Sequence, residues 1–159
     1  MSSCSDRGGE KNPFDLKAAL LARHGQHVVL IHFPIALFIT GAAFDVVALW
    51  RGSRGLATAA YYNLLAAAVT VFPAVATGLL AWQLQLGGAK LKGNLRLHLL
   101  LALASSIAIC LVWGQHFRAR RTVRELASGG QLAAELATVF LVAFTAHLGG
   151  FVSGVNGPN

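Results

Sequence analysis

The chain has 159 residues, of which 55% are hydrophobic and only 12% are charged. An average soluble domain has about 25% charged residues, so this composition excludes an ordinary soluble domain and a disordered chain. The formal net charge of +7 gathers at the ends of apolar segments, where it indicates membrane topology rather than a surface for nucleic acid. We therefore predict an integral membrane protein that lies in a lipid bilayer and binds no nucleic acid.

Residues 1–26 form a polar tail, in which 15–23 (DLKAALLAR) has the pattern of a short interfacial helix. A transmembrane domain is predicted over 27–155. A helix needs ~20 apolar residues to cross a bilayer, and four windows meet this requirement: 27–50, 62–82, 97–115 and 134–155. These windows are rich in Ala and Leu and lack the alternation of barrel strands. The predicted fold class is all-α, an integral membrane four-helix transmembrane bundle.

Aromatic and basic residues mark the ends of these windows. Trp50, Trp82 and Trp113 all lie at predicted span ends, as the residues of an aromatic belt do. The basic residues near span ends are divided evenly between the two sides of the membrane. The positive-inside rule therefore leaves the orientation open. Residues 1–13 are polar, so we expect no signal peptide.

Histidines are the polar residues that indicate a function. Four of the six lie at or inside span ends: His27, His32, His98 and His147. Ionisable groups at membrane depth are costly, and a function is their usual explanation. The first three lie near the starts of the first and third spans, and His147 lies before the end of the fourth. All four are therefore predicted on one side of the membrane, with small residues such as Gly150 on the same helix face as His147.

Several interpretations of these histidines are open. Axial ligation of the iron of heme b requires two histidines at similar depth on facing helices. His32 and His147 meet this requirement best, and His27 with His98 would form a shallower pair. A quinone site and a copper or zinc site are two further interpretations. The simplest one is hydrogen bonding within a packed bundle, since the small residues of the last span also permit close helix contacts.

Asp45 is the other ionisable residue that we consider within the membrane. It lies near the end of the first span, away from the four histidines. We interpret it as a structural polar residue satisfied by Tyr62 and Asn63, and a proton or ion path is the alternative. His24 precedes the first span and His116 follows the third. Both are expected to be solvated.

The first span carries a motif that is similar to one found in a known family. The matching segments are HVVLIHFPIAL (27–37), AFD (43–45), FPAVATGLLAW (72–82), His98 and LGG (148–150). They resemble the bacterial membrane proteins of domain-of-unknown-function family 2231, from about residue 24 to the end of the chain. Val28 stands where that family usually has proline after the first histidine.

The resemblance implies a four-helix domain in the bacterial inner membrane and no established activity. Some family members are fused to Rieske-type iron–sulfur domains, which favours respiratory electron transfer, although this chain has no Rieske ligands. We therefore predict a small b-type cytochrome-like subunit that passes electrons between quinone and a partner redox complex, rather than an enzyme. The alternatives are a non-redox accessory or scaffold subunit of a membrane complex, and a small proton or ion transporter that uses Asp45.

Overall fold

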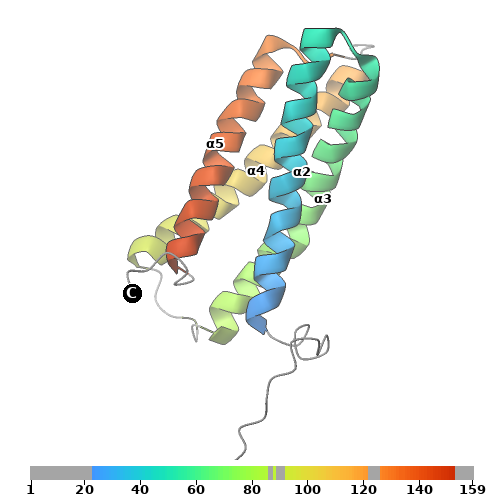
Figure 1. Cartoon of the computed structure of the whole chain (residues 1–159). Coiled ribbons are helices and arrows are strands. Elements are labelled where there is room, and N and C mark those ends of the chain that lie inside the picture. The colour runs from blue at the N-terminus through green and yellow to red at the C-terminus, as the bar shows by residue number, and fades with distance from the viewer. Residues whose placement is uncertain (1–22, 86–87, 89–91, 122–125, 153–159) are drawn as a thin grey trace, which may run out of the picture.

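The computed structural model describes residues 23–85, 88, 92–121 and 126–152 (Figure 1). Within these residues the regular elements are four helices: α2 (Arg23–Arg51), α3 (Arg54–Gln85), α4 (Gly93–Arg121) and α5 (Gly129–Val152). The predicted all-α four-helix bundle is therefore confirmed. The interfacial helix predicted over 15–23 falls almost entirely outside the described residues.

All four helices are long and apolar enough to cross a membrane, over Val29–Arg51, Arg54–Gln83, Gly93–Arg121 and Gly129–Phe151. Large apolar side chains cover the outside of the bundle. Phe72 and Phe140, for example, expose 67% and 76% of their surface. In water such a surface would be strongly unfavourable, whereas lipid chains are its natural solvent. The chain is thus a multi-pass membrane protein.

The turn between α2 and α3 follows directly from its sequence. Gly52 has a φ of 62°, the left-handed conformation that commonly ends helices and that glycine adopts without strain. The Ser53 amide donates to the carbonyl of Ala48 over 2.9 Å. The Ser53 hydroxyl then accepts a 3.4 Å bond from the Leu56 amide, as the first residue of a helix often does. This short turn makes α2 and α3 antiparallel neighbours with an extensive contact.

The start of α5 is fixed by a capping box. The Gln131 amide donates to Ser128 Oγ over 3.3 Å, and the Gln131 side-chain oxygen accepts from the Ser128 amide over 2.9 Å. The helix therefore begins at Gly129, ahead of the predicted span at 134. At the other side of this connection α4 continues to Arg121, past the predicted span end at 115, with three arginines in its last turn. Cations there interact favourably with the helix dipole.

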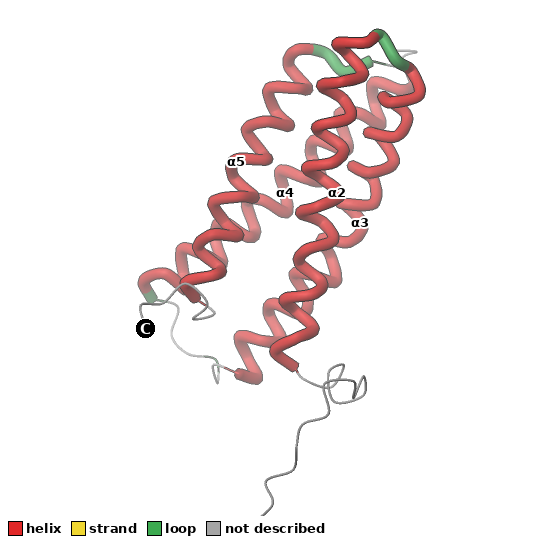
Figure 2. The backbone as a smooth tube through the Cα atoms, in the orientation of Figure 1, coloured by secondary structure: helices red, strands yellow, loops and turns green. Residues whose placement is uncertain are grey.

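The helices form two pairs, because α2 packs mainly on α3 and α4 mainly on α5. The α2–α3 turn and the α4–α5 connection lie at the same end of the bundle, which we call the connection end (Figure 1). The opposite end holds the start of α2 and the end of α5, and we call it the terminal end. The ribbons of the two pairs lie closest at the connection end and separate toward the terminal end (Figure 2).

The second helix pair repeats the first in the same orientation, with a shift of 71 residues along the chain. The equivalent core positions Phe38 and Ile109 are both buried, as are Val71 and Val142. In the same register His27 is equivalent to His98 and Gly78 to Gly149. The two helix pairs therefore place equivalent buried positions at corresponding points along the bundle.

The apolar core lies between the pairs, in the middle of the bundle. Phe38 and Leu64 are completely buried in it. A Cβ atom added to Gly41 would lie 3.0 Å from the Leu64 side chain. Small residues at this point thus let α2 and α3 approach closely, which is how helices gain contact in a membrane. The core leaves two polar regions, one at each end.

Candidate functional site

The first polar region is a histidine pair, His27 on α2 and His98 on α4, at the terminal end. Each is half-buried, and the two imidazoles are close enough to interact electrostatically. They are equivalent residues of the two repeats, since 71 residues separate them. The repeat therefore places the two rings at the same depth on opposite sides of the bundle axis.

The hydrogen bonds of His27 select one tautomer. Its Nδ1 lies 3.2 Å from Thr77 Oγ1. The Thr77 hydroxyl donates its only hydrogen within α3, to the carbonyls of Pro73 and Ala74 over 2.9 and 3.0 Å. Thr77 Oγ1 must therefore accept from the N–H at Nδ1 of His27. In a neutral imidazole the lone pair is then on Nε2.

His98 has the same tautomer for a different reason. Its Nδ1 lies 3.2 Å from the carbonyl oxygen of Thr145 on α5, and a carbonyl can only accept. The Thr145 hydroxyl donates to the carbonyl of Leu141 and accepts from the buried hydroxyl of Ser105 over 2.9 Å. This chain of bonds fixes α5 against α4 beside the ring. Nε2 of His98 consequently also carries a lone pair.

A glycine lies against each ring. A Cβ atom on Gly78 would lie 2.9 Å from Cε1 of His27, and one on Gly149 would lie 3.0 Å from Cε1 of His98. These glycines are again equivalent residues of the two repeats. Each helix pair thus presents one histidine, held by one acceptor and one glycine on the neighbouring helix. Metal-ligating histidines are commonly oriented in this way, by a bond from the other ring nitrogen.

The other predicted histidines differ from this pair. His32 and His147 are exposed, and the His147 ring contacts the edge of Phe151 with 5.1 Å between ring centroids. Gly150 is half-buried in α5. His32 and His147 also have no histidine at the equivalent position of the other repeat. The solvated state predicted for His24 concerns a side chain outside the described part of the chain.

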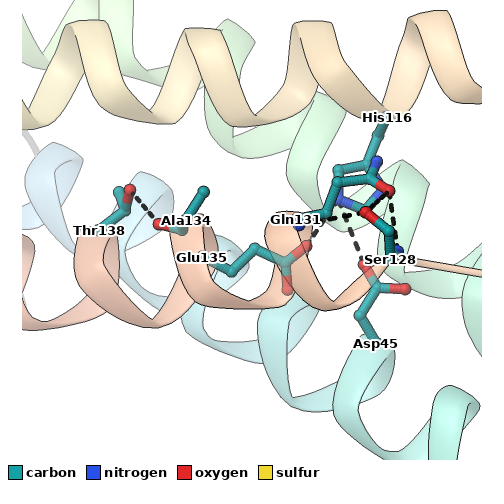
Figure 3. A network of polar contacts seen from close by, with 7 residues as sticks. All are labelled: Asp45, His116, Ser128, Gln131, Ala134, Glu135 and Thr138. Atoms are coloured by element: carbon teal, nitrogen blue, oxygen red, sulfur yellow. Dashed lines mark hydrogen bonds and ion pairs between the residues drawn. The ribbon is translucent and has the colours of Figure 1, made fainter.

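The second polar region is a cluster of Asp45 on α2, His116 on α4 and Glu135 on α5, at the connection end. We call it the acid–histidine cluster (Figure 3). His116 Nε2 lies 2.6 Å from Glu135 Oε1 and 3.6 Å from Asp45 Oδ2. The side chains are almost completely buried, with 1% of Asp45, 8% of His116 and none of Glu135 exposed. Asp45 and His116 are equivalent residues of the two repeats.

Two predictions from the sequence are corrected by this cluster. His116 is buried instead of solvated, because α4 continues beyond residue 115 and turns this ring toward Glu135. Asp45 is also not satisfied by Tyr62 and Asn63. The Asn63 amide group donates to the carbonyl of Ala59 in its own helix, and Tyr62 is 58% exposed.

Sequence reasoning missed Glu135 altogether. Its signal was the acid within the apolar run AAELATVFLVAF (133–144), four residues after Gln131 of the capping box. A further signal was spacing. Asp45 follows His27 by the same 18 residues that separate His116 from His98, so the four residues occupy two equivalent positions on two equivalent helices.

The comparisons with known proteins support the membrane fold. Neither the curated proteins nor the solved structures include a significant match to this chain. A family model does match, over residues 23–157, and the match contains all four helices and both polar regions. The chain therefore belongs to the family described as "Predicted membrane protein (DUF2231)".

Proposed function

We propose that the protein is a small b-type cytochrome-like subunit in which His27 and His98 are the axial ligands of a heme b iron. It would lie in the bacterial inner membrane as part of a larger redox complex and pass electrons between quinone and a partner. The bound heme would supply one-electron transfer. The protein would supply the two ligands, their orientation and a water-poor surrounding.

The observation that supports this proposal most directly is that the two imidazoles have the same tautomer. Each Nδ1 donates a hydrogen bond, to Thr77 Oγ1 or to the Thr145 carbonyl, which leaves Nε2 of both rings able to bind a metal. Both ligands come from equivalent positions of the repeat, so they share a depth in the membrane.

Spectroscopy of the intact protein tests the proposal. The full chain, expressed with ample heme precursor and purified in detergent, should show a b-type spectrum that changes on reduction. His27→Ala and His98→Ala should each lose it, and added imidazole should restore part of the spectrum to the His98→Ala variant. His32→Ala and His147→Ala are the matched controls and should retain it.

Two results would reject this ligand assignment. If the folded protein contains no heme in any preparation, the heme proposal is wrong and the accessory-subunit alternative remains. A spectrum that survives in His27→Ala and His98→Ala but disappears in His32→Ala and His147→Ala would assign the iron to the other pair.

A further inference from the structure

The acid–histidine cluster combines three metal-ligating groups in a place where unpaired charge is costly. One ligand atom from each of Asp45, His116 and Glu135 lies within 4.8 Å of the others. The three side chains come from three helices and meet between the two pairs (Figure 3). The cluster lies six residues before the end of α2 at Arg51, about 9 Å along the helix axis. It is thus within the bundle but near the connection-end surface.

The hydrogen bonds of the cluster are incomplete. Asp45 Oδ2 and Glu135 Oε2 are buried, and neither accepts a hydrogen bond from any residue that the structure describes. A buried carboxylate oxygen without a partner loses its hydration and gains nothing in return. Since both side chains are at least 99% buried, bulk water does not satisfy these atoms. The two oxygens therefore need a positive partner, either a proton shared between the two acids or a cation.

Charge balance leads to the same conclusion. Two ionised carboxylates and one neutral imidazole carry a charge of −2, which one divalent cation would cancel. The nearby charged group is Arg120, whose field reaches Asp45. However, its guanidinium donates to Thr58 Oγ1 over 3.0 Å and stacks on the Tyr61 ring at 4.2 Å. It is thus engaged on α3 and does not bond to either carboxylate.

We infer that Asp45, His116 and Glu135 form a binding site for one divalent first-row transition-metal ion. The mixture of two carboxylates and one imidazole favours Mn²⁺, Fe²⁺ or Zn²⁺ over Ca²⁺ and Mg²⁺, which prefer oxygen ligands alone. The site contains no sulfur and so disfavours Cu⁺. Three protein ligands leave at least one coordination position open.

The distances describe the site before the ion enters. Ligand atoms about 2.1 Å from a tetrahedral metal are about 3.4 Å from one another. The 2.6 Å contact between His116 and Glu135 must therefore lengthen, and Asp45 must move inward. Both changes need only side-chain rotation, because α2, α4 and α5 already hold the three groups around one point.

The repeat provides a variant that should remain folded. Glu135 occupies the position that is equivalent to Leu64 in the first repeat, and both side chains are completely buried. Glu135→Leu thus places in the second pair the residue that the first pair already uses. Asp45→Asn removes a charge with little change of shape. A third variant, His98→Gln, alters only the histidine pair and separates this site from the proposed heme.

The experiment measures metal in the full chain, purified in detergent, stripped with a chelator, reloaded with Zn²⁺ or Mn²⁺ and analysed by mass spectrometry. Co²⁺ serves as a spectroscopic probe, because its visible bands report the coordination number. We expect about one ion per chain in the wild type and in His98→Gln. At least tenfold less should remain in Glu135→Leu and in Asp45→Asn.

The proposal fails if the reloaded, folded wild type holds no more metal than Glu135→Leu, since the cluster is then a metal-free network that shares a proton. It also fails if both cluster variants keep one ion, because the ion then binds elsewhere. His98→Gln tells the two proposals apart. It should lose the heme and keep the ion if both proposals hold. In the wild type, metal without heme supports only this site, and heme without metal supports only the function proposed above.

Discussion

The histidine pair at the terminal end and the acid–histidine cluster at the connection end use the same two helices, α2 and α4, and differ in how their polar atoms are satisfied. In the pair, each ring bonds to a neutral oxygen, Thr77 Oγ1 or the Thr145 carbonyl. In the cluster, ionisable groups contact one another directly and two carboxylate oxygens lack a donor among the described residues. Each ring at the terminal end has an acceptor for its Nδ1 hydrogen, whereas the connection end has two buried carboxylate oxygens without a donor among the described residues.

This contrast teaches how a membrane bundle can hold polar groups for different purposes. Neutral acceptors fix the orientation of a ring and leave its other nitrogen able to bind a metal. Adjacent carboxylates instead create a site that is unfavourable without a cation.

The strongest test removes the imidazole of the cluster. His116→Leu leaves Asp45 and Glu135 buried without the imidazole that lies against both, and in metal-free buffer it should lower the free energy of unfolding by about 3–5 kcal/mol. Replacing all three cluster residues by Leu should recover most of this loss, because packed apolar residues often match a buried ion pair. Thermal unfolding in detergent, followed by circular dichroism, measures both. A triple variant less stable than the single one would contradict the contrast.

The next test adds one methyl group at the histidine pair. Gly149→Ala should push the His98 ring from its acceptor and lower the free energy of unfolding by about 1–3 kcal/mol. Gly78→Ala should act in the same way on His27. The matched control is Gly114→Ala, where no atom lies within 4 Å of the added Cβ, and it should be neutral or stabilise by up to about 1 kcal/mol. Equal effects at Gly149 and Gly114 would show that the ring contact has no role.

A third test uses the different acceptors of the two rings. Thr77→Val removes the hydroxyl acceptor of His27 and leaves only the backbone acceptor at Ala74, so it should weaken heme binding by about 10-fold. Thr145→Val keeps the carbonyl that holds His98, so heme affinity should change little. The Thr145→Val variant loses the hydrogen bond that Ser105 donates, and its free energy of unfolding should fall by about 1 kcal/mol. Heme titration and thermal unfolding of the same two variants separate these outcomes, and identical heme affinities would contradict the proposed ligand orientation.

The smallest effects are expected at the helix starts of the connection end. Ser128→Ala removes the capping box that positions the first turn of α5, and it should cost about 1 kcal/mol. Ser53→Ala loses only a long bond of 3.4 Å and should cost less. If the cluster depends on a well-defined start of α5, Ser128→Ala should also reduce metal occupancy, whereas Ser53→Ala should not.

The fold was predictable because lipid imposes a strong pattern on sequence. A crossing helix needs ~20 apolar residues, and only four windows of the chain provide them. The side of the membrane that holds His27 and His98 followed from the same windows. The sequence did not show which of the histidines are held by hydrogen bonds. The rise per residue predicts the depth of a side chain in the membrane, whereas its burial and its hydrogen-bond acceptor depend on the neighbouring helix. Thr77 and Gly149 lie 50 and 51 residues from the histidines that they contact.

The acid–histidine cluster was missed for a more local reason. The predicted last span begins at residue 134, whereas α5 begins at Gly129, directly after the first residue of the capping box. His116 was assigned to solvent because the apolar window ended before it, although α4 continues through its arginines. Hydropathy marks where a segment is apolar, and helices extend beyond that point when caps and charges favour it.

The repeated helix pairs determine which residues can lie opposite each other between them. Two separate, identical hairpins related by a true two-fold axis could place two aspartates or two histidines opposite each other, but never one of each. Joining the hairpins in one chain lets each position change independently. Asp45 can then oppose His116, and Leu64 can remain apolar where its counterpart is Glu135. The terminal end keeps two like histidines, His27 and His98, while the connection end has the asymmetry that only a single polypeptide permits.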